Sequence, residues 1–281
     1  TLLNAIQTRG YTQPTAIQQD VIPVMLTRRD VLATAQTGSG KTAAYCLPLL
    51  ERYLKQGHSQ TRVVQTLILV PTRELAVQVG DTLRSLSLGA AHPPKLAVLF
   101  GGISINPQML HLRGGADIVV ATPGRLLDLH SKNAIKLDHV SCLVLDEADR
   151  MLALGFADEL KQVLALLAPQ RQNCFFSATF APNVAELAQA LLSDPARINI
   201  PDTDESKPDI TQRAIMVEAT QRTQLLKHLF QTEKWSRVLV FVATKYAADL
   251  LSTKLRRAHI SAEAFHGEQT QGKRSQVISD F

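Results

Sequence analysis

Residues 31–42 read VLATAQTGSGKT, a short apolar segment that runs into a glycine-rich loop. Apolar residues at helical spacing follow it, so the expected order is strand, loop, helix. Gly38 and Gly40 would let backbone N–H groups curl around phosphate oxygens, Lys41 would contact the β- and γ-phosphates, and Thr42 would offer a hydroxyl group to Mg²⁺. The stretch therefore predicts a phosphate-binding loop, although Ala35 stands where the general pattern has glycine. The alternative is a glycine-bearing turn that only joins a strand to a helix.

Further short apolar segments rich in β-branched residues follow along the chain, separated by amphipathic helical stretches. This alternation predicts βαβ units and a parallel sheet. The near-continuous apolarity of residues 67–70 and 143–145 indicates that helices cover both faces of the sheet. We therefore expect a doubly wound α/β layer. The predicted strands cover residues 31–35, 66–70, 96–100, 118–121, 143–145 and 174–177.

Two domains are expected from the length of 281 residues and from a change of composition near residue 201. Residues 201–209 read PDTDESKPD, which is typical of an exposed connection between domains. The first domain would cover residues 1–200, and the second would begin at residue 210. In residues 210–281 we expect strands at 238–242 and 262–265, a helix over 245–257 and another from Gln271. That is about half of an ordinary α/β domain.

An acidic tetrad, Asp-Glu-Ala-Asp, occupies residues 146–149 directly after a predicted strand. Open α/β sheets place their ligands beyond the carboxyl ends of the strands, so the acids should face the phosphate-binding loop. Asp146 would hold Mg²⁺, and Glu147 would orient and deprotonate the attacking water. Ser177 and Thr179 follow another predicted strand and could bond Asp149, reporting the state of the nucleotide. The alternatives are an acidic N-terminal turn of a helix and hydroxyl groups that cap the next helix.

The bulk composition argues against a disulfide-bonded, zinc-binding or membrane-spanning protein. The formal net charge is +5 and the sequence pI is about 9.2, which favours a polyanionic partner only weakly. Three cysteines, Cys46, Cys142 and Cys174, lie far apart in apolar runs, so we expect buried thiols in a reducing compartment rather than disulfides or a zinc site. The sequence has no secretory leader and no apolar run long enough to span a bilayer, so we expect a cytoplasmic protein without a membrane partner.

Together these segments resemble the DEAD-box family of superfamily 2 RNA helicases, whose name the tetrad spells. Residues 10–18, GYTQPTAIQ, match that family's adenine-reading motif, and alanine is its usual residue at the position of Ala35. The resemblance implies RecA-like domains, the second of them incomplete, with ATP and Mg²⁺ as ligands. It implies that Tyr11 stacks on the adenine ring and that Gln18 bonds its edge. The nucleotide-binding residues would be Tyr11, Gln18, Ala35, Gln36, Thr37, Gly38, Ser39, Gly40, Lys41 and Thr42.

The same resemblance implies contacts to the sugar-phosphate backbone of single-stranded or short duplex RNA. Glycines, helix N-termini, hydroxyl groups and arginines suit such contacts and carry little base information. Each segment also has a plainer explanation, as a helix cap, a turn or a solvated charge. The residues implied are Pro71, Thr72, Arg73, Gly101, Gly102, Thr122, Pro123, Gly124, Arg125, Thr244, Gln271 and Arg274.

Two arginine-bearing motifs that the family carries further along do not occur in residues 1–281. Such arginines stabilise the transition state of phosphoryl transfer, so we expect this chain alone to bind ATP and to hydrolyse it slowly. One alternative is a nucleotide-gated RNA-binding module without turnover. Another is a motor that acts on DNA, which the phosphate-binding loop alone would allow. Asp149, at whose position many relatives have histidine, and the motif that contains Gln18 favour RNA.

Overall fold

The computed structural model describes residues 2–56, 62–201 and 210–281, which divide into two units, Thr1–Lys207 and Pro208–Phe281. All but Pro201 of the predicted 201–209 connection lies outside the described residues. The described contacts fix the fold within each unit.

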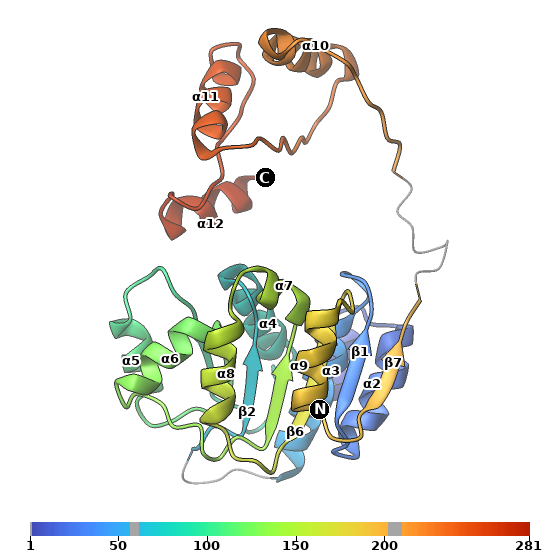
Figure 1. The fold of residues 1–281 in the computed structure, drawn as a ribbon, viewed down its shortest axis with the longest axis vertical. Helices are drawn as coiled ribbons and strands as arrows, with labels where there is room; N and C mark the ends of the chain where they lie inside the picture. The colour runs from blue at the N-terminus through green and yellow to red at the C-terminus, as the bar shows by residue number, and fades with distance from the viewer. Residues whose placement is uncertain (1, 57–61, 202–209) are drawn as a thin grey trace. The chain divides into compact units, whose positions relative to one another are not determined.

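The first unit is built on one sheet of seven parallel strands in the order β3-β4-β2-β5-β6-β1-β7 (Figure 1). The predicted parallel, doubly wound arrangement is therefore confirmed. The strands are β1 (Val31–Thr34), β2 (Thr66–Leu69), β3 (Leu96–Leu99), β4 (Ile118–Ala121), β5 (Cys142–Leu145), β6 (Gln172–Ser177) and β7 (Ala196–Asn199).

Both faces of this sheet are buried, which explains the near-continuous apolarity of its strands. Successive side chains alternate between the faces, so Phe175 packs in one apolar cluster and Phe176 in the other. Both rings are fully buried, and burying each contributes about 1.5–3 kcal/mol. The free cysteines Cys46, Cys142 and Cys174 are buried in the same cluster as Phe176, which confirms the prediction of buried thiols.

Helices cover the two faces as separate layers (Figure 1). One face is covered by α1 (Leu2–Thr8), α2 (Ala16–Leu26), α3 (Lys41–Gln56) and α4 (Arg73–Leu86). The other is covered by α5 (Asn106–Leu112), α6 (Pro123–Ser131), α7 (Ala148–Ala153), α8 (Ala157–Ala165) and α9 (Pro182–Leu191). Among the described residues, no helix has both the length and the apolar character needed to cross a membrane.

The carboxyl ends of all seven strands meet at one edge of the sheet, to which the arrowheads of β2 and β6 point in Figure 1. The order of strands divides this edge into two halves. The loops after β5, β6 and β1 are neighbours, and the loops after β3, β4 and β2 are neighbours. The acids, the hydroxyl groups and the phosphate-binding loop fall in the first half. The candidate RNA contacts of residues 71–73, 101–102 and 122–125 fall in the second.

The second unit departs from expectation in its strands. Its described residues contain a short 3₁₀ turn at Ala219–Gln221 and the helices α10 (Arg222–Glu233), α11 (Lys245–Arg256) and α12 (Gln271–Asp280). Helices near 245–257 and from Gln271 are confirmed. The strands predicted at 238–242 and 262–265 are wrong for this structure, because neither segment is paired in a ladder within residues 210–281. A strand requires hydrogen bonds to a neighbouring strand, and an apolar run alone does not supply them.

Candidate functional site

The phosphate-binding loop lies between β1 and α3 and requires its two glycines. Gly38 and Gly40 have φ angles of +85° and +97°, in the region where side-chain-bearing residues are strained. A Cβ atom at Gly40 would lie 2.6 Å from Nε2 of Gln18. Glycine is therefore needed at Gly40 both for the backbone angle and for the close approach of α2. Ser39 closes the turn by donating from Oγ to the carbonyl oxygen of Gln36 at 2.8 Å.

Lys41 begins α3, and its ammonium group is held inside the loop. Nζ donates to the carbonyl oxygens of Ala35 and Gln36, the latter at 3.1 Å. Burial lowers the pKa of Lys41, while the negative charges of Asp146, Glu147 and Asp149 act in the opposite direction. The ammonium group thus lies where the acids after β5 can act on it. An ammonium group has three donors, so Lys41 keeps one N–H for a phosphate oxygen beside these two carbonyl acceptors.

Asp146 directly follows β5 and is almost fully buried, at 3% exposure. The hydroxyl group of Tyr45 donates to Oδ2 at 2.8 Å, and the backbone N–H of Glu147 donates to Oδ1 at 2.9 Å. Burial raises the pKa of Asp146 to about 6, although the Tyr45 hydrogen bond and the charge of Lys41 lower it. Two hydrogen bonds therefore fix the position of the carboxyl group. Burial makes its ionised form unfavourable, and a nearby cation would offset that cost.

Glu147 precedes α7 in a left-handed conformation, with φ 51° and ψ 49°. For a residue other than glycine this conformation costs about 1–3 kcal/mol, and such strain is concentrated at functional sites. Its Oε2 atom accepts a hydrogen bond from Nη1 of Arg150 at 3.1 Å. The side chain of Glu147 is 16% exposed, so one carboxylate in this pair of acids is partly open to solvent while Asp146 is not.

Asp149 is joined to the loop after β6. Thr179 donates to Oδ2 of Asp149 from its backbone nitrogen at 3.0 Å and from its hydroxyl group at 2.8 Å. The hydroxyl group of Ser177 donates to the carbonyl oxygen of Thr179 at 2.7 Å. Burial would raise the pKa of Asp149, but hydrogen bonds from Thr179 and Arg150 together lower it. The predicted hydrogen bond to Asp149 is present for the hydroxyl group of Thr179, whereas the hydroxyl group of Ser177 donates to the backbone of Thr179 instead.

The two candidate adenine contacts differ in how firmly they are held. Gln18 is buried, its Oε1 accepts from the backbone nitrogen of Thr15 at 3.1 Å, and its Nε2 donates to the carbonyl oxygen of Gly40 at 3.3 Å. A carboxamide has two N–H bonds and two acceptor lone pairs, so Gln18 keeps one donor and one acceptor for a ligand. Tyr11 is more exposed, and the guanidinium carbon of Arg9 lies 5.8 Å from its ring centroid.

The candidate RNA contacts of the first unit gather on the second half of the edge. Thr72 caps α4, and its hydroxyl group accepts from the backbone nitrogen of Leu75 at 3.3 Å. Gly102 has a φ of +77°, and a Cβ atom there would collide with the Arg73 guanidinium group. Pro71, Gly101, Thr122, Pro123 and Gly124 complete these loops.

Arg125 is the most constrained of these candidates. Its side chain is 8% exposed, and Nη2 donates to the carbonyl oxygen of Ile103 at 2.8 Å. Nε and Nη1 find no hydrogen-bond acceptor within the part of the chain that the structure describes, although Oδ2 of Asp128 lies 3.8 Å from Nε. A buried guanidinium group with unused donors suits an anionic ligand.

The candidates in residues 210–281 lie at helix starts. Thr244 caps α11 and accepts from the backbone nitrogen of Ala247 at 3.1 Å. Gln271 begins α12, and the guanidinium carbon of Arg274 lies 5.1 Å from the ring centroid of Phe265. These three residues are described only within their own unit.

Comparison with known proteins places this geometry in a family. Residues 15–187 match the family model described as DEAD/DEAH box helicase. The chain belongs to this family. Residues 221–281 match the model described as helicase conserved C-terminal domain. The resemblance inferred from the motifs is therefore confirmed.

DEAD-box relatives and a solved structure resemble most of the chain. The RNA helicase CrhR of Synechocystis sp. is 38% identical over 97% of this chain. A probable ATP-dependent RNA helicase, ddx42 of Dictyostelium discoideum, is 39% identical over all of it. The chain spans 54% and 28% of the lengths of these two relatives. A DEAD box protein from the hyperthermophile Methanococcus jannaschii is 35% identical, with a TM-score of 0.66 over 99% of this chain and 73% of that one.

The DEAD-box fold implies a magnesium ion, and the residues present fit one. No group of three His, Cys, Asp or Glu side chains that could hold a metal occurs among residues 2–56, 62–201 and 210–281. Mg²⁺ does not require such a group, because it keeps several waters and uses one or two protein oxygens together with substrate phosphates. The Asp146 carboxylate and the Thr42 hydroxyl group are oxygen donors of that kind.

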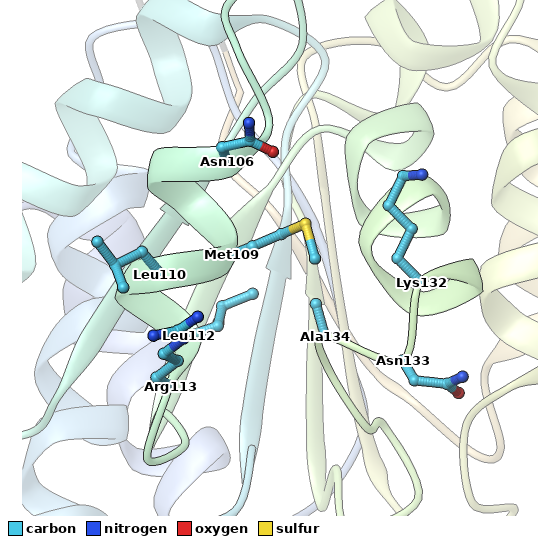
Figure 2. Close-up of a pocket in the computed structure, with 8 residues that line it drawn as sticks. All are labelled: Asn106, Met109, Leu110, Leu112, Arg113, Lys132, Asn133 and Ala134. Carbon is cyan, nitrogen blue, oxygen red and sulfur yellow. The ribbon is translucent and has the colours of Figure 1, made fainter.

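A groove of about 470 Å³ beside α5 and the end of α6 lies outside this site (Figure 2). Met109 and Leu112 from α5 and Ala134 from the segment after α6 form its apolar part, with Arg113 and Lys132 at its margins. None of the residues predicted to bind nucleotide, metal or RNA lines it. This groove therefore lies apart from the residues predicted to bind nucleotide, metal or RNA.

Tyr45 is the site residue that sequence reasoning missed. It lies within the apolar stretch of α3, where an aromatic side chain predicts core packing and nothing more. Its hydrogen bond to Asp146 joins residues 101 positions apart, so no local pattern reveals it. The contact of Gln18 with Gly40 was missed for the same reason, because it joins residues 22 positions apart.

Replacing Asp146 with asparagine should change how stability depends on pH in the absence of metal. The pKa is about 6 in the folded chain and 3.8 as an ordinary value, so the protonated carboxyl group favours folding. That contribution is full below about pH 3.8 and is lost as the pH rises through 6. Between pH 4 and pH 7.5 the free energy of unfolding of the wild type should therefore fall by up to about 3 kcal/mol relative to that of Asp146→Asn.

Urea unfolding of both proteins at the two pH values measures this difference, because Asp146 is the one titrating group that the substitution removes. The lost or altered hydrogen bonds of the asparagine do not depend on pH and cancel in the comparison. If the free energies of unfolding of the two proteins change by the same amount between the two pH values, the pKa of Asp146 is not raised.

Proposed function

We propose that this DEAD-box protein binds ATP with Mg²⁺ and couples the binding and hydrolysis of ATP to local RNA unwinding or RNA–protein remodelling. One observation carries the proposal: helix α3, which begins at the loop lysine Lys41, is joined to the buried Asp146 by the 2.8 Å hydrogen bond from Tyr45, where the ends of β1, β6 and β5 are neighbours. A cation and a rigid carboxylate at a glycine-rich loop form the pair that a metal-bound triphosphate requires.

The residues divide the work of hydrolysis among neighbouring strand ends. In this proposal Lys41 binds the β- and γ-phosphates after giving up at least one of its carbonyl acceptors, Ala35 or Gln36. Asp146 and Thr42 hold the metal, which when bound would neutralise charge on the phosphates. Glu147 orients the attacking water and accepts its proton, since its carboxylate is partly open to solvent. Asp149, with Ser177 and Thr179, ties the acidic loop to the loop after β6.

Adenine recognition is assigned to Tyr11 and Gln18. The carboxamide of Gln18 is pinned on one side by Thr15 and Gly40, so its remaining donor and acceptor have a fixed direction. Such a pair can match the adjacent donor and acceptor of adenine and oppose the pattern of guanine. Tyr11 would supply a stacking surface.

RNA is assigned to the loops after β2, β3 and β4. Helix N-termini, Gly101-Gly102 and the buried Arg125 offer donors to phosphate oxygens without reading bases. Thr244, Gln271 and Arg274 would add contacts from the second unit. The names of the relatives CrhR and ddx42 contain RNA helicase, which supports RNA over DNA.

We also propose the domain roles and the location. Residues 1–200 would be a RecA-like ATP-binding helicase domain, 201–209 a connection, and 210–281 part of a second RecA-like domain. The three buried free cysteines favour a reducing compartment, so we assign the protein to the cytoplasm.

RNA should stimulate ATP hydrolysis by this chain, and DNA of the same sequence should not. Replacing Arg125 with alanine removes a charge-assisted contact worth about 1.5–3 kcal/mol, so the RNA concentration for half-maximal stimulation should rise about tenfold or more. Arg113→Ala is the matched control, since Arg113 lies on the same half of the unit but outside the proposed interface. Hydrolysis is followed by phosphate release over a range of RNA concentrations.

Equal stimulation by RNA and DNA would favour a motor that acts on DNA. RNA-dependent binding without any hydrolysis would favour the nucleotide-gated binding module. Melting temperatures of both variants show whether a change arises from unfolding of the buried Arg125 site.

A further inference from the structure

Tyr45 brings a hydroxyl group into the core beside the proposed magnesium ligands. The side chain is fully buried, and its ring lies against Phe176 with the centroids 5.2 Å apart. The ring alone would fill this space. A buried hydroxyl group costs free energy unless it is hydrogen-bonded, so its presence calls for a polar reason.

The polar partner of that hydroxyl group is Asp146, one of the two residues assigned to the metal. The hydroxyl group donates to Oδ2 of Asp146 at 2.8 Å. A phenol has one proton to donate, and Tyr45 gives it to this carboxylate. Thr42, the other residue assigned to the metal, lies three residues before Tyr45 on α3.

The other oxygen of Asp146 is fixed independently. Oδ1 accepts from the backbone nitrogen of Glu147 at 2.9 Å. Each carboxylate oxygen therefore has one protein donor, and the plane of the carboxylate is set by two elements, α3 and the start of α7. Tyr45 is the contact that joins the helix bearing Lys41 and Thr42 to the strand end bearing Asp146.

We infer that Tyr45 is a positioning residue for the magnesium site, holding the Asp146 carboxylate in the orientation that receives the metal. This inference rests on the proposed function. Partners that orient metal ligands by hydrogen bonds commonly contribute 10–100-fold to metal affinity. The aromatic ring serves packing, and the hydroxyl group serves the site.

Tyr45→Phe keeps the ring and removes the hydroxyl group. The Mg²⁺ concentration for half-maximal binding of a fluorescent ATP analogue should rise about 10–100-fold, while affinity in EDTA should stay within about twofold. Tyr53→Phe is the matched control. Tyr53 lies on the same helix and also hydrogen-bonds to an aspartate, Asp117 at 3.4 Å, but Asp117 precedes β4 at the opposite edge of the sheet. Its Mg²⁺ titration should match that of the wild type.

A second variant pair tests the same inference through a thermodynamic cycle. If Tyr45 acts through Asp146, adding Tyr45→Phe to Asp146→Asn should shift the Mg²⁺ titration by less than about twofold. The double variant also lacks the buried charge, so it answers the question even if Tyr45→Phe alone is unstable. Melting temperatures without nucleotide are recorded for every protein.

The outcomes separate the inference from the function. A Tyr45→Phe titration that coincides with a Mg²⁺-dependent wild type would overturn the role of Tyr45 and leave the proposed function standing. The role of Tyr45 would also be overturned if Tyr45→Phe shifted the Mg²⁺ titration of Asp146→Asn by the same factor as it shifts that of the wild type. Nucleotide binding by the wild type that does not depend on Mg²⁺ would instead remove the proposed metal site itself.

Discussion

Replacing Glu147 with glutamine is expected to lower the rate of ATP hydrolysis by about 10²–10⁴-fold, the range that a positioned general base contributes. Glutamine has nearly the same shape but cannot accept the proton of the attacking water. Affinity for ATP should change little, because Lys41 and Asp146 remain in place. Single-turnover hydrolysis and equilibrium binding of a fluorescent ATP analogue measure the two quantities separately.

The design of this comparison depends on the ion pair that Glu147 makes with Arg150 at 3.1 Å. Arg150 is 57% exposed, and exposed pairs contribute about 0–1 kcal/mol, so losing it should not unfold the unit. Glu186→Gln on the exposed face of α9 removes a carboxylate outside the site and serves as the control. If Glu147→Gln hydrolyses ATP at the wild-type rate, Glu147 is not the base.

Replacing Lys41 with alanine should weaken Mg²⁺–ATP binding by about 10²-fold or more. Hydrogen bonds to a charged group contribute about 1.5–3 kcal/mol each, and the proposed lysine contacts two phosphates. The loss is partly offset because the wild-type lysine, which has three donors, must give up at least one of its carbonyl acceptors, Ala35 or Gln36, to contact two phosphates. Fluorescence titration with the ATP analogue measures the change.

Lys55→Ala is the control for that variant. Lys55 lies near the end of the same helix and pairs with Glu51 at 2.9 Å on the surface. It removes the same charge from α3 without touching the loop. Unchanged affinity in Lys41→Ala would mean that the loop does not bind phosphate, and the assignment of the site would fail.

The parts of the fold that could be predicted are those with strong local signals. Strands buried on both faces have continuous apolar sequence, which is why β2 and β5 were found within a residue or so of their ends. β7 was missed because it is an edge strand in which only Ile198 is buried while Arg197 and Asn199 are exposed, unlike the other edge strand, β3, which is largely buried and apolar. The 238–242 segment has the composition of a strand, but pairing depends on distant residues that composition does not encode.

The site shows the same division between local and distant information. The glycines and Lys41 are adjacent in sequence, so their geometry follows from one turn. The burial of Arg125 and the hydrogen bond of Tyr45 to Asp146 arise only when separate strands meet at one edge. Spacing along the chain could suggest which residues gather there, but not which hydrogen bonds they make.

The most direct measurement of the central claim is the Mg²⁺-dependent binding of fluorescent ATP and GTP analogues to the wild-type chain and to Gln18→Ala. Gln19→Ala is the control, since the exposed amide of Gln19 donates to the nearby Pro14 carbonyl oxygen, at 3.0 Å. The structure predicts that the wild type and Gln19→Ala prefer ATP in the presence of Mg²⁺, and that Gln18→Ala loses this preference. Equal affinity of the wild type for ATP and GTP, or no Mg²⁺-dependent binding of either, would contradict the assignment of an adenine-selective nucleotide site.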